Sequence, residues 1–202
     1  MNERQKLKFG SINYAVILAR SGSKSIKDKN ITHILGRRLI SYVIDEAKKS
    51  KEINKIFVLT DSKKYQNIFL KMGVEVPFLR PKNISTDSSK DIESFYYFYK
   101  WLESNNKKIP DLFVHLRATA PLINFKDIDL AIKSINKKKD ADSLKSIRET
   151  FMSPYKMWSL NKNGFMKPIL KLPKKNIEAW NMSRHDLPKV FWQDAQIDIV
   201  KR

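Results

Sequence analysis

The 202-residue sequence contains no cysteine. This absence excludes a disulfide framework, a zinc site built on thiolates and a cysteine nucleophile. Long apolar runs are also missing, because the basic N-terminus leads only into the short apolar stretch 14–19, whereas a membrane span needs roughly 20 apolar residues. The sequence therefore predicts a soluble, cytoplasmic protein that does not bind a membrane.

Acidic residues are few relative to basic ones, with 21 Asp+Glu against 40 Lys+Arg and a formal net charge of +19. A basic nucleic-acid-binding domain is one interpretation of this charge. The other is a compositionally biased surface on a protein that handles small anions. We favour the second, with no nucleic-acid partner, because only nine of the basic residues are arginines and the lysines are spread along the whole chain.

Apolar runs and helical patterns alternate through the first 150 residues. The continuous apolar run 14–19 predicts a buried strand, and the apolar stretches 55–60, 74–79 and 112–116 predict three more strands. The stretch 142–148 fits a fifth strand. Apolar residues at helical spacing predict helices at 39–49, 63–72 and 88–102, and a fourth that contains 128–135. We expect Gly73 to end the second helix and Ser88 or Ser89 to cap the third. Strands separated by helices favour a three-layer α/β fold with a mostly parallel sheet.

The pattern breaks after Thr150, where the segment 151–192 holds four of the eight prolines and three of the four tryptophans. We interpret this segment as an excursion from the sheet, serving as a small flap or an oligomer contact. The stretch 195–200 alternates like a returning strand. The expected organisation is a core of residues 1–150, the excursion 151–192 and a returning strand within 193–202.

Ligands of open parallel sheets bind beyond the carboxyl ends of the strands. The loop 20–30, after the first strand, combines small residues with cations that suit a triphosphate, namely Arg20, Lys24, Lys27 and Lys29. It lacks the glycines of a Walker A loop and of the dinucleotide fingerprint, so a solvated surface turn remains the alternative. Arg80 and Arg117 follow two further predicted strands, and arginines at three neighbouring strand ends predict an anion site.

Taken in order, these segments resemble the acylneuraminate cytidylyltransferases, which are the CMP-sialic acid synthetases and their relatives. The resemblance extends from Tyr14 to Val200 and is carried by Ala15–Asn30, Asp61, Phe78–Pro81, Ser85–Asp87, His115–Leu122, Ser153–Trp158 and Arg184–Pro188. It implies a Rossmann-like nucleotidyltransferase fold and a homodimer. The implied reaction joins CTP and a nine-carbon 2-keto sugar acid into a CMP-sugar with release of pyrophosphate, and Mg²⁺ would bridge the phosphates.

The resemblance also implies roles for individual residues, with the core binding the nucleotide and the excursion serving the sugar site or the dimer. The nucleotide would be held by Arg20, Ser21, Gly22, Ser23, Lys24, Lys29, Asn30, Arg80, Thr86 and Asp87. The sugar acid would be held by Arg117, Thr119, Lys156 and Arg184. Arg20, Lys24 and Lys29 would be catalytic, because aligning the triphosphate and stabilising its charge is what this reaction requires.

The sequence departs from the family in two places. Arg117 stands where many relatives have glutamine, which leaves the sugar open among sialic, legionaminic, pseudaminic and related acids. Relatives continue past the last strand to an acidic metal-binding segment, whereas this chain ends at Arg202. We therefore expect a catalytically weak, truncated homologue with unknown metal ligands, in which Asp194 and Asp198 are stray carboxylates and His115 is a sheet residue. A Kdo-type cytidylyltransferase ranks lower, because the first loop lacks the Gly-Lys ending of that motif.

Overall fold

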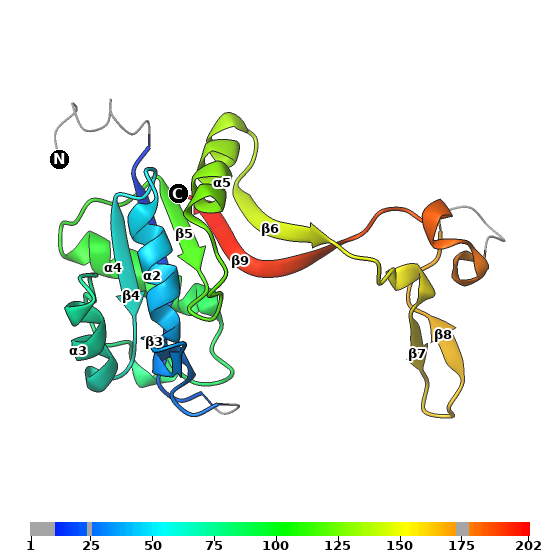
Figure 1. The fold of residues 1–202 in the computed structure, drawn as a ribbon, viewed down its shortest axis with the longest axis horizontal. Helices are drawn as coiled ribbons and strands as arrows, with labels where there is room; N and C mark the ends of the chain where they lie inside the picture. Colours follow the sequence, from blue (N-terminus) through cyan, green and yellow to red (C-terminus); the bar gives the residue numbers. More distant parts are fainter. Residues whose placement is uncertain (1–10, 24–25, 173–177) are drawn as a thin grey trace. The chain divides into compact units, whose positions relative to one another are not determined.

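The computed structural model describes residues 11–23, 26–172 and 178–202. The chain divides into two compact units. Figure 1 colours the ribbon along the sequence, from blue at the N-terminus to red at the C-terminus. The first runs up to Lys145 and includes Ala195–Arg202, and the second covers Ser146–Asp194. Within the described ranges, no helix is long and apolar enough to cross a membrane.

The main sheet has five strands in the order β4-β1-β5-β9-β6. In chain order these are β1 (Asn13–Leu18), β4 (Lys55–Leu59), β5 (Leu112–Leu116), β6 (Ser143–Glu149) and β9 (Phe191–Lys201). Strand β1 pairs in parallel with both β4 and β5, and β9 pairs antiparallel to β5. The last strand of the chain therefore lies between two strands that precede it in the sequence.

In the described part of the chain, four α-helices accompany these strands: α2 (Leu39–Lys49), α3 (Lys63–Lys71), α4 (Asp91–Ser104) and α5 (Phe125–Lys137). Gly73 follows α3 with a φ of 70°, which confirms it as the stop signal of that helix. A small hairpin of β2 (His33–Ile34) and β3 (Arg37–Arg38) precedes α2. Single 3₁₀ turns η1 (Lys29–Ile31) and η2 (Lys82–Ile84) lie in the loops.

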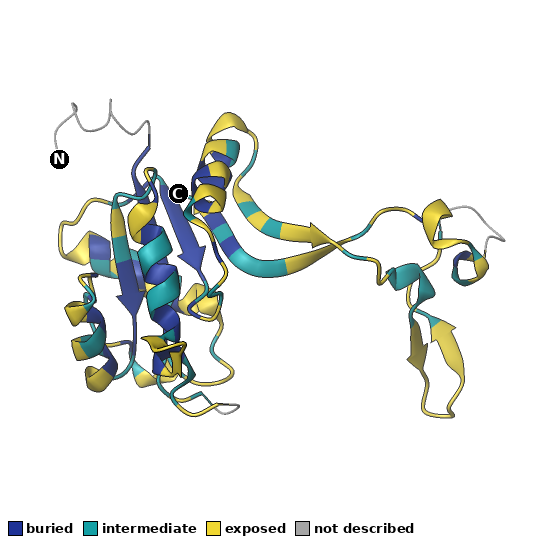
Figure 2. Ribbon diagram, in the orientation of Figure 1, coloured by how far each residue is buried: buried dark blue, intermediate teal, exposed yellow. Residues whose placement is uncertain are grey.

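The sheet is covered on both faces, as the unbroken apolar strands predict. Ala15 and Ile17 of β1 belong to one buried cluster with side chains of α2, α3 and α5. Tyr14 and Val16 point the other way and join a second cluster with α4. Figure 2 shows buried residues in β5, in part of β4 and along α2, whereas β6 is exposed or intermediate. The three-layer α/β fold is confirmed.

The segment 74–79 does not form the predicted third strand. It makes two isolated parallel bridges, one to β4 and one to the residue after β4. Pro77 lies between them and has no N–H to donate, so the ladder cannot continue. Val74 and Val76 are nevertheless buried. The segment therefore has the apolar pattern of a strand because it is buried, but Pro77 prevents a continuous strand.

The predicted serine cap of α4 is also wrong. The helix is capped by Lys90, whose N–H donates to the Glu93 carboxylate at 2.9 Å. The Ser89 hydroxyl instead accepts a bond from the Thr86 N–H at 3.0 Å. Ser88 lies in the same preceding loop, with its hydroxyl 3.0 Å from that of Thr86. The serines are used to shape the loop before the helix.

The second unit contains a short antiparallel hairpin of β7 (Trp158–Leu160) and β8 (Met166–Pro168). Its remaining turns are the 3₁₀ helices η3 (Pro154–Lys156), η4 (Ala179–Asn181) and η5 (Arg184–Asp186). The rings of Trp158 and Trp180 lie 5.1 Å apart. Many large apolar side chains of this unit are exposed, among them Phe151, Leu160, Phe165 and Trp192. The unit is held by turns and short contacts rather than by a covered sheet.

Candidate functional site

A polar cavity of about 310 Å³ lies at the carboxyl ends of β1 and β5. The loops that follow these two strands and the segment 74–79 supply its walls. The cavity therefore occupies the position where parallel sheets bind ligands. It is lined by these predicted residues: Arg20, Ser23, Lys29, Asn30, Arg80, Thr86, Asp87, Arg117 and Thr119.

The loop after β1 is tied at several points. Asp61 accepts bonds from the Ser21 N–H at 2.7 Å and from the Ser21 hydroxyl at 3.1 Å. The Arg20 guanidinium donates to the Gly22 carbonyl at 2.7 Å. Ser21 and Gly22 do not line the cavity, so the structure gives them a role in shaping the loop. Lys24 lies outside the described residues, and its role stays a prediction.

The two ends of the loop are joined through Asn30. This side chain is 7% exposed, and its Nδ2 donates to the Arg20 carbonyl at 3.0 Å. Lys29 and Asn30 both belong to η1 and both line the cavity. The basic loop is therefore an ordered wall of the cavity in its described part, which disfavours a simple solvated turn.

Two arginines of the cavity are paired with aspartates of the same cavity. Arg20 pairs with Asp87, and Arg117 Nη1 donates to Asp91 Oδ2 at 2.8 Å. Arg117 Nη2 also lies 3.4 Å from Asp198 Oδ2. Partly exposed pairs of this kind contribute about 0–1 kcal/mol. An anionic ligand could therefore replace the aspartates at little cost in free energy. In the absence of a ligand, the two pairs hold both guanidinium groups at the cavity wall.

Arg80 is the buried arginine of the site, with 7% of its surface exposed. Burial lowers the pKa of its guanidinium, although the group stays charged at neutral pH. Its Nη2 donates to the Ile84 carbonyl. Within the described residues its Nε has no hydrogen-bond partner. A buried donor of this kind at a cavity wall is available for a polar ligand atom.

His115 lies inside β5 and lines the cavity while only 6% exposed. Burial, with the nearby Arg117 charge, lowers its pKa to about 4. The Phe95 ring packs at 5.0 Å, and Asp198 Oδ2 is 4.0 Å from Nδ1. The imidazole is therefore neutral near pH 7 and adds no positive charge to the anion site.

The cations predicted for the sugar acid fall into both units. Arg117 and Thr119 line the polar cavity of the first unit. Lys156 and Arg184 lie in the second unit and do not line that cavity. The Lys156 ammonium donates to the Met182 carbonyl at 2.6 Å and to the Trp180 carbonyl at 3.2 Å, whereas Arg184 is exposed in η5. Lys156 therefore makes structural hydrogen bonds within its own unit.

The carboxylates of the described residues form no metal-binding cluster. In the ranges that the structure describes, no group of three or more His, Cys, Asp or Glu side chains could hold a metal ion. Asp198 pairs with Arg117 and lies 3.7 Å from the Lys145 ammonium. Asp194 accepts a bond from the Ser146 hydroxyl. Each of these carboxylates already faces a hydrogen-bond donor or a cation.

Asp91 is a cavity residue that the sequence analysis missed. It is the first residue of α4 and pairs with Arg117, 26 positions away. The sequence signal was an acidic residue at a helix N-terminus. The helix was predicted to begin at Ser88. Asp91 was therefore not recognised as its first residue.

The comparisons with known proteins identify the family of the chain. A family model described as Cytidylyltransferase matches residues 14–195. The chain belongs to the cytidylyltransferase family. It is 40% identical over 116 residues to the pseudaminic acid cytidylyltransferase of Campylobacter jejuni subsp. jejuni serotype O:2, covering 57% of this chain and 49% of that protein. It is 30% identical over 189 residues to the N-acylneuraminate cytidylyltransferase of Streptococcus agalactiae serotype III, covering 93% and 43%.

The chain spans about a third to a half of the length of several curated relatives that it matches. Among solved structures, CMP:2-keto-3-deoxy-manno-octonic acid synthetase complexed with CTP superposes with a TM-score of 0.67 at 14% identity. This superposition covers 95% of the present chain and 74% of the other. At that identity the likeness establishes the fold, and the expected Rossmann-like nucleotidyltransferase architecture is confirmed.

Proposed function

We propose that this chain transfers the cytidylyl group of CTP to a 2-keto sugar acid of the sialic or pseudaminic type and releases pyrophosphate. The observation that carries the proposal is the cavity at the strand ends, into which Arg20, Lys29, Arg80 and Arg117 converge. Relatives named for pseudaminic acid and N-acylneuraminate support this sugar class. An eight-carbon Kdo-type acid remains the second candidate, supported by the fold of the CTP-bound neighbour.

The proposed chemistry is a single displacement at phosphorus. The anomeric hydroxyl of the sugar attacks the α-phosphorus, the bond to the β-phosphate oxygen breaks, and pyrophosphate leaves with the charge of that bond. Arg20 and Lys29 neutralise the triphosphate and align it, which is the main catalytic demand of such transfers. Lys24 keeps its proposed catalytic role. The hydroxyl proton passes to solvent, because a histidine with a pKa of about 4, such as His115, is too weak a base to hold it at neutral pH.

Magnesium enters the proposal only as a partner of the triphosphate oxygens, where a divalent cation offsets phosphate charge. No ligand from this chain is assigned to it, because the cavity carboxylates Asp87 and Asp91 are paired with arginines. Arg117 and Thr119 are proposed for the sugar acid from within the cavity. Lys156 and Arg184 are proposed for the same ligand on charge alone.

A homodimer in the cytoplasm completes the proposal. The exposed apolar side chains of the second unit support an interface there, since large apolar patches on a lone chain are uncommon. Light scattering at micromolar concentration tests this point, and a molecular mass near twice 23.7 kDa is the expected result. A mass equal to one chain at all concentrations contradicts the homodimer.

Ligand selectivity is the decisive experiment for the function. Thermal unfolding is followed with CTP, UTP, ATP and GTP, and formation of the CMP-sugar is assayed with CTP, Mg²⁺ and a panel of eight- and nine-carbon keto sugar acids. CTP at about 100 times its Kd should add about 2.7 kcal/mol to the free energy of unfolding. Equal stabilisation by every nucleotide contradicts the proposal. Preference for DNA or RNA with steep salt dependence favours the basic nucleic-acid-binding domain.

A further inference from the structure

We infer that Asp28 is a positioning residue, which joins the basic loop to the buried Tyr65 of α3 and thereby turns Lys29 and Asn30 toward the cavity. The inference concerns the geometry of the loop. What Lys29 and Asn30 bind rests on the proposed function.

The backbone of Asp28 holds the start of η1. Asp28 has a φ of 56° and a ψ of 28°, which is the left-handed conformation that residues with a side chain rarely adopt. Its carbonyl accepts bonds from the Ile31 N–H at 2.9 Å, the Thr32 N–H at 3.0 Å and the Thr32 hydroxyl at 3.2 Å. The turn that carries Lys29 and Asn30 therefore closes mainly onto this carbonyl, and the Thr32 N–H also reaches the Lys29 carbonyl at 3.2 Å.

The side chain of Asp28 explains how the unusual backbone is held. One carboxylate oxygen accepts from the Tyr65 hydroxyl at 2.8 Å, and the other accepts from the Lys64 ammonium at 3.2 Å. Tyr65 is 1% exposed and packs against Phe69, with 5.7 Å between ring centroids. Its ring is thus fixed by the core, and its hydroxyl is a rigid anchor for a loop residue.

The bond between Asp28 and Tyr65 persists across neutral pH. The Tyr65 hydroxyl lowers the pKa of the Asp28 carboxyl, with Lys64 contributing in the same direction. Burial raises the pKa of Tyr65 well above its ordinary value, and the Asp28 carboxylate raises it further. The acceptor therefore stays ionised and the donor keeps its proton.

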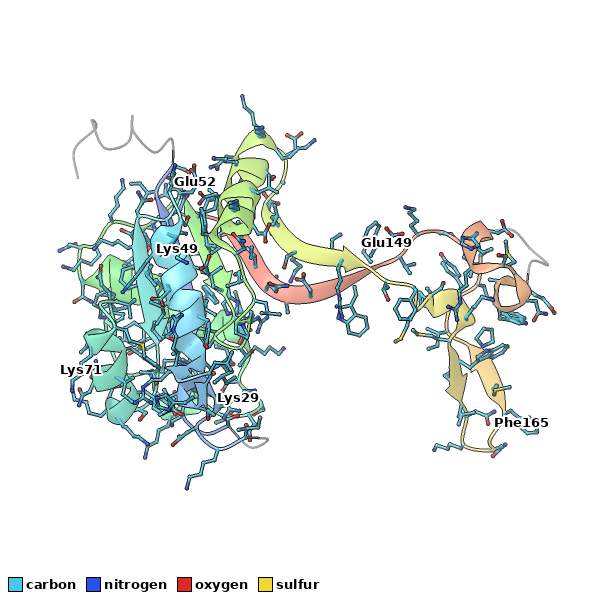
Figure 3. The ribbon with its side chains drawn as sticks, viewed as in Figure 1. Lys29, Lys49, Glu52, Lys71, Glu149 and Phe165 are labelled. Carbon is cyan, nitrogen blue, oxygen red and sulfur yellow. The ribbon has the colours of Figure 1, made fainter. Side chains whose placement is uncertain are left out.

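A continuous set of contacts leads from the core to the anion site. Tyr65 holds Asp28, the Asp28 carbonyl closes η1, and Asn30 in η1 donates to the Arg20 carbonyl. Figure 3 shows Lys29 at the end of the sheet toward which β4 and β5 run in Figure 1. The tie thus acts on three cavity residues, Arg20, Lys29 and Asn30, although neither Asp28 nor Tyr65 lines the cavity.

The test uses variants that separate the carboxylate from the backbone conformation. Tyr65→Phe removes one hydroxyl and keeps the ring in the core. Asp28→Gly makes the left-handed backbone easier and removes the carboxylate, whereas Asp28→Asn keeps one oxygen acceptor for Tyr65. Tyr99→Phe is the matched control, because it removes a tyrosine hydroxyl that bonds a carboxylate, that of Glu103, elsewhere on the unit.

We expect Tyr65→Phe and Asp28→Gly to raise the Kd and KM for CTP by roughly 3- to 10-fold, the scale of one lost hydrogen bond. The KM for the sugar should not change, and Asp28→Asn should lie close to the unchanged chain. A merely structural residue would instead lower the unfolding temperature without this selective effect. CTP binding by Asp28→Gly as tight as that of the unchanged chain overturns the inference.

Amide hydrogen exchange supplies a readout that needs no nucleotide. Residues 29–32 should exchange faster in Tyr65→Phe and Asp28→Gly, and at the original rate in Tyr99→Phe. If the unchanged chain fails to bind CTP, the proposed function fails, yet the exchange rates still decide the inference. Inorganic triphosphate then serves as the binding probe. Unchanged exchange in both variants overturns the inference.

Discussion

The two compact units differ in how their apolar side chains are used. In the first unit, successive residues of β1 point to opposite faces and each face is covered by helices. In the second unit, Phe151, Leu160 and Phe165 are among many large apolar side chains left exposed. The first unit therefore has its own core, on which a precise polar site can be built. The second unit leaves apolar surface exposed, which is available for contact with another molecule.

The largest expected effect comes from removing a core aromatic of the first unit. Phe98 is fully buried and lies 4.8 Å from Phe57 between ring centroids. Phe98→Ala should lower the free energy of unfolding by about 3–5 kcal/mol, because it removes apolar contacts and leaves a cavity. Urea unfolding measures the change. Phe165→Ala, at a 70% exposed position of the second unit, is the control, and a similar loss there would break the contrast between the units.

The next effect is a pH dependence of stability that arises from His115. Below pH 6.5 the unfolded histidine takes up a proton, whereas the folded one stays neutral until about pH 4. The unfolded state then binds more protons, so the free energy of unfolding falls as the pH drops through this window. The pKa difference corresponds to about 3 kcal/mol. The groups that face the imidazole are Arg117, Asp91, Asp198 and Lys145.

Urea unfolding between pH 7.5 and 4, compared with His115→Gln, isolates this contribution, because glutamine does not titrate. The unchanged chain should lose more stability than the variant over this range. Parallel pH curves for the two proteins would mean that the pKa of His115 is the same in the folded and unfolded states and would contradict this prediction.

A smaller effect is expected in nucleotide binding. Arg20→Ala should weaken CTP binding by about 1–2 kcal/mol, roughly 5- to 30-fold, since a charge-assisted bond is lost. Calorimetric titration measures the affinity. Lys156→Met in the second unit should leave CTP affinity intact and raise the sugar KM. If CTP binding weakened equally in both variants, the hypothesis that Arg20 serves CTP and Lys156 serves the sugar acid would be wrong.

The smallest effect is expected from Asp91→Asn. This change removes a negative charge from the cavity while Arg117 keeps its contact with Asp198. CTP binding without divalent cation should tighten by up to about 1 kcal/mol, and added salt should reduce the gain. Glu149→Gln, which removes the partner of Lys189 in the second unit, should change nothing. Weaker CTP binding in Asp91→Asn would show that Asp91 itself contacts the ligand.

Much of the site followed from the sequence because its signals are local. The loop 20–30 carries its cations directly after a buried strand, and Arg80 and Arg117 also follow extended segments. The rule that ligands bind at the carboxyl ends of parallel strands then brought these residues together. Asp91 escaped this reasoning because its place depended on where α4 begins. Lys156 was assigned to the sugar acid from the resemblance, and no local pattern indicated that its ammonium donates to carbonyls of its own unit.

The sequence by itself determined that β1, β4 and β5 are largely buried strands, where α3 stops and which loop is basic. These features depend on residue type and spacing within a few positions. Tertiary structure alone decided that β9 lies between β5 and β6, that Pro77 ends a ladder, and that Asp28 meets Tyr65. Such partners are separated by tens of residues, so their contact depends on the order in which strands and helices pack. A local pattern carries no information about that order.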